Sequence, residues 1–178
     1  MTGSTGRTAN LVGALSVAVT DRIKWAVFDG ANLGGEAVAA LVAIGHSPGM
    51  TITQLGSVLE RSHPAAVRIV DRLQDAKLVK RDRASGDRRS VTLTLTSRGF
   101  AHRHAILDRR QLALQRIVDL VEPADRRTLE RLAAAILGAL PQDAASALAI
   151  CRYCDEQRCG SCPMEPFGSV SGQAAGRG

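Results

Sequence analysis

The stretch SHPAAVRIVDRLQDAKLVKRD, residues 62–82, decides the fold that we expect for this chain. Its apolar residues recur with helical spacing, and Pro64 stands in the first turn, where the N–H that proline lacks is not needed. Ser62 supplies a hydroxyl of the kind that caps a helix N-terminus. We therefore expect a helix beginning after Ser62, with an inward face made by Val67, Val70 and Leu73.

The next stretch, RASGDRRSVTLTLTSRG at residues 83–99, changes from helical to alternating periodicity. Its apolar residues fall on one face of an extended chain and its threonines on the other, as in a half-buried strand; these apolar residues are Val91, Leu93 and Leu95. Residues 78–82 can form the antiparallel partner, with a turn at residues 84–87. A two-stranded hairpin is marginal alone, so we expect it to pack on the helices before it.

A short helix is also predicted directly upstream. Thr51 and Gln54 have the spacing of a capping box, in which the hydroxyl and the amide each satisfy one free backbone N–H. A tight turn at Glu60 and Arg61 joins this helix to the one after Ser62. Two short helices followed by a hairpin indicate a winged helix-turn-helix, whose second helix would enter the major groove of DNA.

Basic residues concentrate in the hairpin. The chain has 23 lysines and arginines against 17 acidic residues, a formal charge of +6. Residues 77–89 hold six basic and two acidic residues, which leaves a local charge of +4. A basic hairpin alone can be a solvated edge, but after a recognition helix it favours contact with DNA phosphates and the minor groove.

We expect nine residues of these two elements to contact DNA. On the recognition helix they are Ser62, His63, Ala65, Arg68 and Arg72. On the hairpin they are Arg83, Asp87, Arg88 and Arg89. Asp87 can orient the guanidinium of Arg89 by a charge-assisted hydrogen bond, although an aspartate there equally suits a simple turn cap.

Further helices are expected on both sides of this unit. The patterns predict one helix through the stripe from Leu11 to Val27, one over residues 36–44, a long one after Thr96 to about residue 121, and one opened by Pro123. Because only 3% of the residues are aromatic, small aliphatic side chains must pack closely, which favours helices. The long helix has two apolar stripes, and the second indicates either a partner subunit or burial on both sides within one chain.

Residues 62–82 and 86–99 resemble the MarR family of transcriptional regulators. The resemblance is strong over residues 55–99 and rests on helix pattern alone elsewhere within about residues 10–140. It implies a mainly α fold, with a winged helix-turn-helix, a two-stranded wing and a helical dimerisation region. It also implies an obligate homodimer on a pseudo-palindromic operator, with an interface built by the N-terminal helix and the two C-terminal helices.

The same resemblance implies roles for particular residues. Asp87 and Arg89 match the family's Asp-x-Arg pattern in the wing, and Arg68 and Arg72 fall at its recognition-helix positions. The usual effector would be a small molecule held between the dimerisation and DNA-binding regions.

A four-cysteine segment departs from the MarR pattern. Its ligand candidates form a Cys-x2-Cys-x4-Cys-x2-Cys array, made by Cys151, Cys154, Cys159 and Cys162. Structural zinc held by four thiolates is our leading interpretation. An iron–sulfur cluster is the alternative, because four cysteines suffice for either common cluster and a proline after the last one is also found in ferredoxins. Redox-active thiols are a third interpretation, and a redox-active segment would itself be the sensor.

The predicted function is that of a sequence-specific, double-stranded DNA-binding transcriptional regulator, and a repressor is expected rather than an activator. The regulator would respond to metal or redox state if the four-cysteine segment senses either. We expect a dimerisation helix at residues 1–35, a DNA-binding domain at residues 36–99 and two further dimerisation helices at residues 100–142. A cysteine-rich metal-binding segment at residues 143–167 and a disordered tail at residues 168–178 would follow.

Other classes of protein are less favoured. We expect no enzyme, because the sequence has no nucleophile motif, no phosphate-binding glycine loop and no carboxylate–histidine metal signature. The alternatives are a zinc-stabilised protein-interaction module and a Cys-x-x-Cys thiol oxidoreductase. No run of about 18 uncharged apolar residues exists, so we expect a cytoplasmic protein that does not span a membrane.

Overall fold

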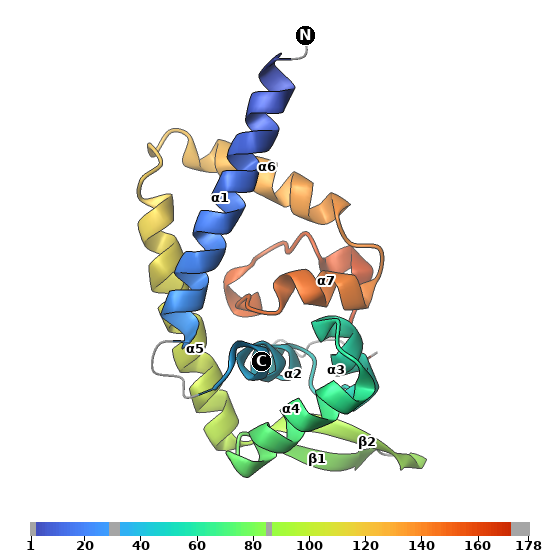
Figure 1. Cartoon of the computed structure of the whole chain (residues 1–178). Coiled ribbons are helices and arrows are strands. Elements are labelled where there is room, and N and C mark those ends of the chain that lie inside the picture. The colour runs from blue at the N-terminus through green and yellow to red at the C-terminus, as the bar shows by residue number, and fades with distance from the viewer. Residues whose placement is uncertain (1–2, 29–32, 85–86, 172–178) are drawn as a thin grey trace.

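The computed structural model describes residues 3–28, 33–84 and 87–171, and leaves out the side chains of residues 3–4, 83–84 and 87–90. This part of the chain is mainly helical, with one two-stranded sheet and two short 3-10 helices (Figure 1). The elements are α1 (Gly3–Phe28), α2 (Gly35–His46), α3 (Ile52–Leu59), α4 (His63–Asp75), β1 (Val79–Ala84), β2 (Asp87–Leu95), α5 (Ser97–Val118), α6 (Arg126–Ala139), α7 (Ala144–Cys151), η1 (Glu156–Arg158) and η2 (Glu165–Phe167). The mainly α, winged helix-turn-helix fold predicted from the sequence is confirmed.

Helix α2 is the centre of the core. All residues from Ala37 to Ile44 are buried, because α2 packs against α1, α3, α4, α5 and β2. A helix that is apolar all round must be covered on every side, which explains why this segment has no polar stripe. The remaining helices of the winged helix are therefore positioned around α2.

The turn between α3 and α4 follows the sequence pattern closely. The Thr51 hydroxyl accepts a hydrogen bond from the Gln54 N–H at 3.2 Å, and the Gln54 amide oxygen accepts one from the Thr51 N–H at 2.7 Å. Glu60 ends α3 in the left-handed conformation, with φ of 53°. At Gly56 an added Cβ would lie 3.0 Å from the Arg61 carbonyl oxygen, so a glycine lets the chain turn this tightly.

Helix α4 begins where the sequence predicts but differs in two details. Ser62 is the N-cap residue, yet its side chain makes no capping hydrogen bond. Val67 is only half-buried. The inward face is instead formed at spacings of three and four residues by Ala66, Ile69, Val70 and Leu73.

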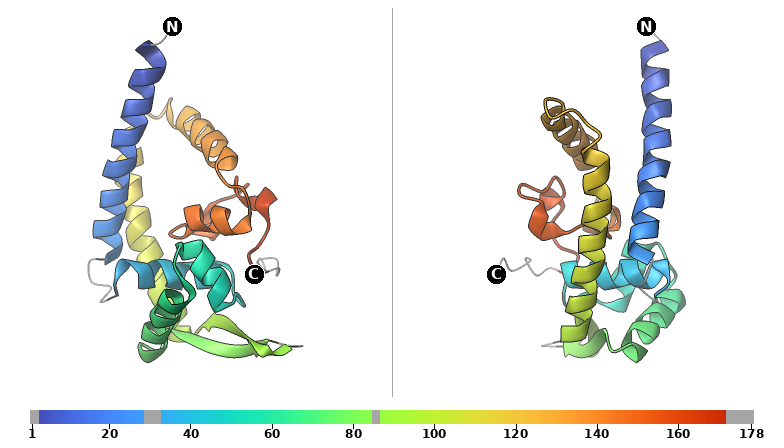
Figure 2. Two further views of the ribbon diagram at one scale, coloured as in Figure 1. Left: turned by 45° about the vertical axis from the view of Figure 1, so that its right-hand side comes forward. Right: turned by 90° about the vertical axis from the view of Figure 1, so that its left-hand side faces the viewer.

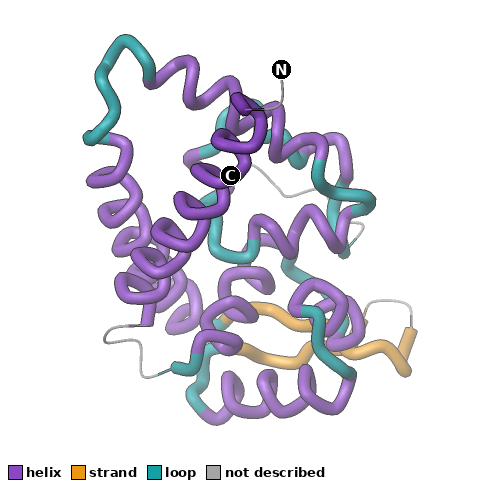
Figure 3. The backbone as a smooth tube through the Cα atoms, turned by 45° about the horizontal axis from the view of Figure 1, so that its top comes forward, coloured by secondary structure: helices purple, strands orange, loops and turns teal. Residues whose placement is uncertain are grey.

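The hairpin pairs Val79 with Leu95 and Arg81 with Leu93. Leu93 and Leu95 are buried as expected, whereas Val91 is exposed, since it lies farther out along the hairpin. Figure 3 shows that these two strands are the only extended elements among the described residues. Gly99 is required behind them, because an added Cβ would lie 2.0 Å from the Leu78 carbonyl oxygen.

Helices α1, α5 and α6 project away from the winged helix. Helix α1 packs along α5, and its N-terminal half extends beyond the other helices (Figure 2). The α6 helix begins at Arg126 rather than at Pro123, because residues 123–125 form a turn with Asp125 as the N-cap. None of the described helices is long and apolar enough to cross a lipid bilayer.

The C-terminal segment, residues 143–171, lies against the winged helix on the side away from α4 and the hairpin (Figures 1 and 2). Its Leu148 joins the main core, and α7 packs against α3. Residues 168–171, predicted to begin a disordered tail, are described and hold contacts with α2 and α3. Residues 172–178 lie outside the described part of the chain.

Candidate nucleic-acid interface and the cysteine segment

The outward face of α4 carries the five helix residues predicted to contact DNA. Ala65 is half-buried, and four of the five are exposed: Ser62, His63, Arg68 and Arg72. Neither Arg68 nor Arg72 makes a hydrogen bond or ion pair with another residue of the described chain. The structure thus brings two unpaired guanidinium groups and the N-terminal end of a helix onto one face.

The hairpin is held against α4 by a pair that the sequence did not reveal. The Arg81 guanidinium donates to the Asp71 carboxylate at 2.6 Å. The two residues are ten positions apart and on different elements, so no periodicity connects them. Their pairing fixes where the base of the hairpin lies relative to the recognition helix.

A second polar contact stabilises the hairpin itself. The Thr94 hydroxyl donates to the Asp82 carboxylate at 2.6 Å, and Lys80 lies 3.3 Å from the same carboxylate oxygen. The hydrogen bond from Thr94 is the main reason that the pKa of Asp82 is lowered, and Lys80 adds to it. Two of the six basic residues of the hairpin region, Lys80 and Arg81, are therefore paired within the protein.

The four hairpin residues predicted to contact DNA lie at its outer end. The backbones of Arg83, Asp87, Arg88 and Arg89 belong to β1 and β2. Their side chains lie outside the described part of the structure. Their contacts with DNA, and the proposed Asp87–Arg89 bond, stay predictions.

The cysteine array is brought together on the opposite side of the winged helix. Cys151 ends α7 and is buried, Cys154 and Cys162 are half-buried, and Cys159 is exposed. All four are free thiols, arranged as two hydrogen-bonded pairs, Cys151 with Cys154 and Cys159 with Cys162. The charges of the other three act on Cys151, so the two pairs lie near each other.

The pKa values of Cys151 and Cys154 are shifted in opposite directions. The hydrogen bond from Cys151 lowers the pKa of Cys154 to about 6, against the opposing effect of burial, with help from the charges of Arg110 and His46. The same hydrogen bond, together with burial, raises the pKa of Cys151. The Arg110 guanidinium also donates to the Cys154 sulfur at 3.7 Å. Cys154 is therefore the more easily deprotonated of the two.

The space around the thiols is larger than one metal ion needs. Three of the four cysteines, Cys151, Cys159 and Cys162, line a cavity of about 550 Å³. Among the described residues, no three histidine, cysteine, aspartate or glutamate side chains converge as ligands of a single ion. Cys151 also stands at the C-terminal end of α7, whose dipole disfavours a thiolate, whereas redox-active cysteines gain from a helix N-terminus.

A buried ion pair ties the cysteine segment to the core. Glu156, two residues after Cys154, pairs with Arg103 of α5, whose side chain is only 7% exposed. His46 of α2 lies 3.3 Å from the same carboxylate oxygen. Burial alone would raise the pKa of Glu156, but the hydrogen bond from His46 and the charge of Arg103 outweigh it and lower the pKa to about 2.

A glycine makes this pair possible. At Gly45 an added Cβ would lie 2.4 Å from the Arg103 Cδ, so only a glycine of α2 lets the arginine pass. Nothing in the sequence pattern relates Gly45, Arg103 and Glu156, which come from three separate segments.

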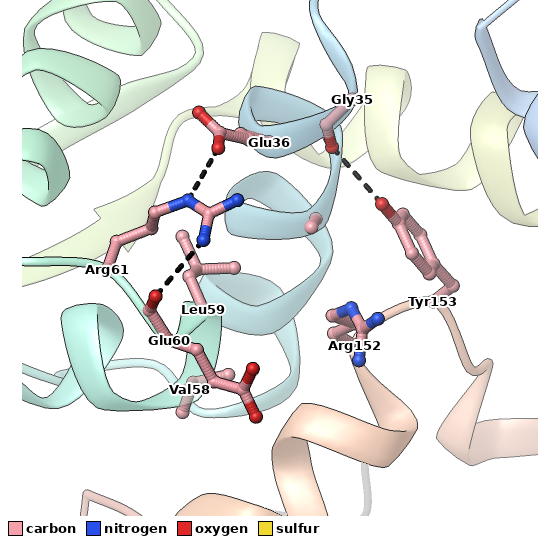
Figure 4. A pocket seen from close by; sticks show the side chains of 9 residues that line it. Gly35, Glu36, Val58, Leu59, Glu60, Arg61, Arg152 and Tyr153 are labelled. Carbon is pink, nitrogen blue, oxygen red and sulfur yellow. Dashed lines mark hydrogen bonds and ion pairs between the residues drawn. The ribbon is translucent and has the colours of Figure 1, made fainter.

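Further contacts join the segment to α2 and α3 around a cavity of about 350 Å³ (Figure 4). The Tyr153 hydroxyl donates to the Gly35 carbonyl at 3.2 Å, and beside it Arg61 donates to Glu36 at 2.6 Å. Farther along, the Gln54 amide donates to the Val170 carbonyl at 2.7 Å. The residue that closes the capping box of α3 thus also holds the end of the C-terminal segment.

Comparison with known proteins identifies the central part of this arrangement. Residues 31–90 match the model of the MarR family. This region runs from just before α2 to the middle of β2 and holds all nine residues predicted to contact DNA. No curated protein sequence matches the chain significantly.

Solved structures show the same fold over most of the chain. RV1404 from Mycobacterium tuberculosis is 24% identical, with a TM-score of 0.67 over 80% of this chain and 97% of that one. A MepR variant from S. aureus, solved bound to an oligodeoxyribonucleotide, is 17% identical, with a TM-score of 0.54 over 75% and 98%. The M. tuberculosis MarR family protein RV2887, solved with salicylic acid, is 21% identical, with a TM-score of 0.58 over 71% and 93%.

Proposed function

We propose that this chain, which carries a MarR-family winged helix at residues 31–90, is a sequence-specific, double-stranded DNA-binding transcription regulator. The observation that carries the proposal is the outward face of α4, where Arg68 and Arg72 are exposed and unpaired within the described chain. Charged groups that do not stabilise the fold are free to neutralise phosphates. MepR, which has this fold, is solved with DNA.

The arrangement suits contact with two neighbouring grooves. Helix α4 would enter the major groove with its N-terminal end, where Ser62 and His63 reach base edges or phosphates. Pro64 and Ala65 allow a close approach there. The hairpin, fixed to α4 by the Asp71–Arg81 pair, would then place Arg89 at the adjacent minor groove.

The proposed functional unit is a homodimer. Large apolar side chains are exposed along α1 and along α6, which has no buried residue: Leu11, Val12, Leu15, Val17, Leu129, Leu132, Ile136 and Leu140. Apolar faces of this extent need covering, and a second copy covers both at once. Two copies would present two α4 helices to half-sites about one DNA turn, roughly 34 Å, apart. A dimer bound across a promoter would act as a repressor by occlusion.

DNA selected from a random pool by the purified protein tests this proposal. Fluorescence anisotropy should show tight binding to the selected sequence, and Arg68→Ala and Arg72→Ala should each weaken it by about 1–3 kcal/mol. Arg116→Ala is the matched control, since it removes one exposed positive charge near the C-terminal end of α5. Equal effects of all three variants, or no retained DNA at low salt, would contradict the proposal; the second result would favour a protein-interaction module.

Sedimentation measurements test the dimer. The double variant Leu132→Glu with Ile136→Glu places two charges on the exposed face of α6 and should give a monomer. Phe100→Glu changes an equally exposed apolar residue at the other end of the molecule and should leave the dimer intact. A parent protein that sediments as a monomer at micromolar concentration would exclude the homodimer.

A further inference from the structure

The four thiols of the cysteine segment form one site rather than two separate pairs. They come from the end of α7 and the loop around η1, and their charges act on one another. Three of them border the cavity of about 550 Å³, which also reaches His46 of α2. The segment therefore places three potential thiolates around a space, with the fourth, Cys154, next to Cys151.

One arginine beside the thiols, Arg110, has a donor without a partner among the described residues. Arg110 donates to the Cys154 sulfur through one nitrogen, while its buried Nε has no partner in the described structure. The Nε of Arg103 also lacks a partner in this part of the chain, but the charge of this arginine is already balanced by Glu156. Leaving the Arg110 donor unpaired is costly, so its position favours an anionic group beside Cys154.

We propose that Cys151, Cys154, Cys159 and Cys162 bind an iron–sulfur cluster. Either common cluster with four cysteine thiolates carries a net charge of about −2, which suits the positive charge of Arg110. A zinc ion held by four thiolates would have the same net charge of about −2. It would, however, need four sulfurs that converge on one point, and it would need no cavity. The described thiols do not converge in this way, and they border a space that a cluster's own iron and sulfide atoms can occupy.

The site is connected to the recognition helix through the contacts of its own loop. Glu156 holds α5 and α2, and α7 packs on α3, which positions α4. If the proposed DNA binding holds, a bound cluster strengthens the contacts that position α3 and α4 and so favours the arrangement that binds DNA. The cluster-loaded protein should then bind its operator about 5-fold or more tightly than the cluster-free protein.

Metal and sulfide analysis of the full chain purified without oxygen tests the site. We expect coloured protein with iron and acid-labile sulfide in similar amounts, and loss of both in the double variant Cys159→Ser with Cys162→Ser. Ser161→Gly is the control, because it changes the same loop, keeps all four thiols and suits the left-handed φ of 57° at that position. Colourless protein with one zinc per chain, or with no metal, would overturn the cluster.

The arginine beside the thiols gives a second, independent measurement. Arg110→Ala removes a positive charge next to Cys154 and should shift the cluster's reduction potential to more negative values, whereas Arg116→Ala should leave it unchanged. Equal potentials in the parent and both variants would contradict the placement of the cluster beside Arg110.

Operator binding with and without the cluster completes the test. Equal affinity of the loaded and cluster-free proteins would overturn the coupling to DNA. Failure of both forms to bind any DNA would instead reject the proposed function, while the iron and sulfide contents still decide the site.

Discussion

The two sides of the winged helix use their charged residues in opposite ways. On the α4 side, Arg68 and Arg72 are exposed and unpaired within the described chain. On the opposite side, Arg103 is buried and paired with Glu156, a residue 53 positions away. The charges of Arg68 and Arg72 contribute little to folding and are available to a partner, whereas the Arg103–Glu156 pair holds two parts of the protein together.

This contrast predicts that the largest effect on stability comes from the buried pair. Glu156→Gln leaves the Arg103 guanidinium buried without its countercharge, which should cost about 3 kcal/mol of unfolding free energy in urea titrations. Glu36→Gln breaks the pair with Arg61, which is about half exposed on both partners, and should cost less than about 1 kcal/mol. Similar losses in the two variants would remove the contrast between buried and exposed pairs.

The same pair makes stability depend on pH. The pKa of Glu156 is lowered from 4.5 to about 2, so its stabilising contribution is present at and above a pH near 4.5. It should be lost as the pH falls from there through about 2. The acid side of the stability profile should therefore be flatter in Glu156→Gln than in the parent protein.

On the DNA side, Arg89→Ala should reduce affinity without reducing stability. We expect operator binding to weaken by about 1–3 kcal/mol, the usual value for an arginine inserted into a groove. The unfolding free energy should change by less than about 0.5 kcal/mol. A gel-shift titration with unchanged affinity would reject the role of the hairpin in binding.

Thr51→Ala tests a polar residue used for folding at the N-terminus of α3. Its hydroxyl accepts from the Gln54 N–H, so removal should cost about 1 kcal/mol of unfolding free energy. Thermal or urea denaturation measures this. A change below about 0.3 kcal/mol would mean that the capping box contributes little to this helix.

Ser62→Ala is the matching change at the N-terminus of α4 and should have a smaller effect on stability than Thr51→Ala. Its hydroxyl makes no capping bond, so the unfolding free energy should stay within about 0.5 kcal/mol of the parent value. Operator affinity should nevertheless fall a few-fold, because the free hydroxyl faces DNA in the proposed complex. Loss of stability without loss of affinity would show that Ser62 caps α4 after all.

The accuracy of the sequence predictions follows how local each signal is. The capping box at Thr51, the proline in the first turn of α4 and the alternation around Leu93 are signals within a few residues, and each predicted its element correctly. Ser62 shows the limit even there, since the sequence indicates a residue suited to capping but not whether its hydroxyl points to the backbone.

The candidate sites divide in the same way. The sequence identified the exposed residues of α4 and the spacing of the four cysteines, because both are read along the chain. It did not identify the Asp71–Arg81 pair, or the contact of Arg110 with Cys154, because these contacts join residues from different elements.

By itself, the sequence determined the winged helix, its basic hairpin and the regular spacing of four cysteines. Local periodicity, helix capping and charge density depend on neighbouring residues, so they need no knowledge of the fold. Only the tertiary structure decided where the cysteine segment lies and which charges it uses. Glu156, Arg103 and His46 meet because three distant segments pack around α2, and Gly45 leaves the space for that meeting.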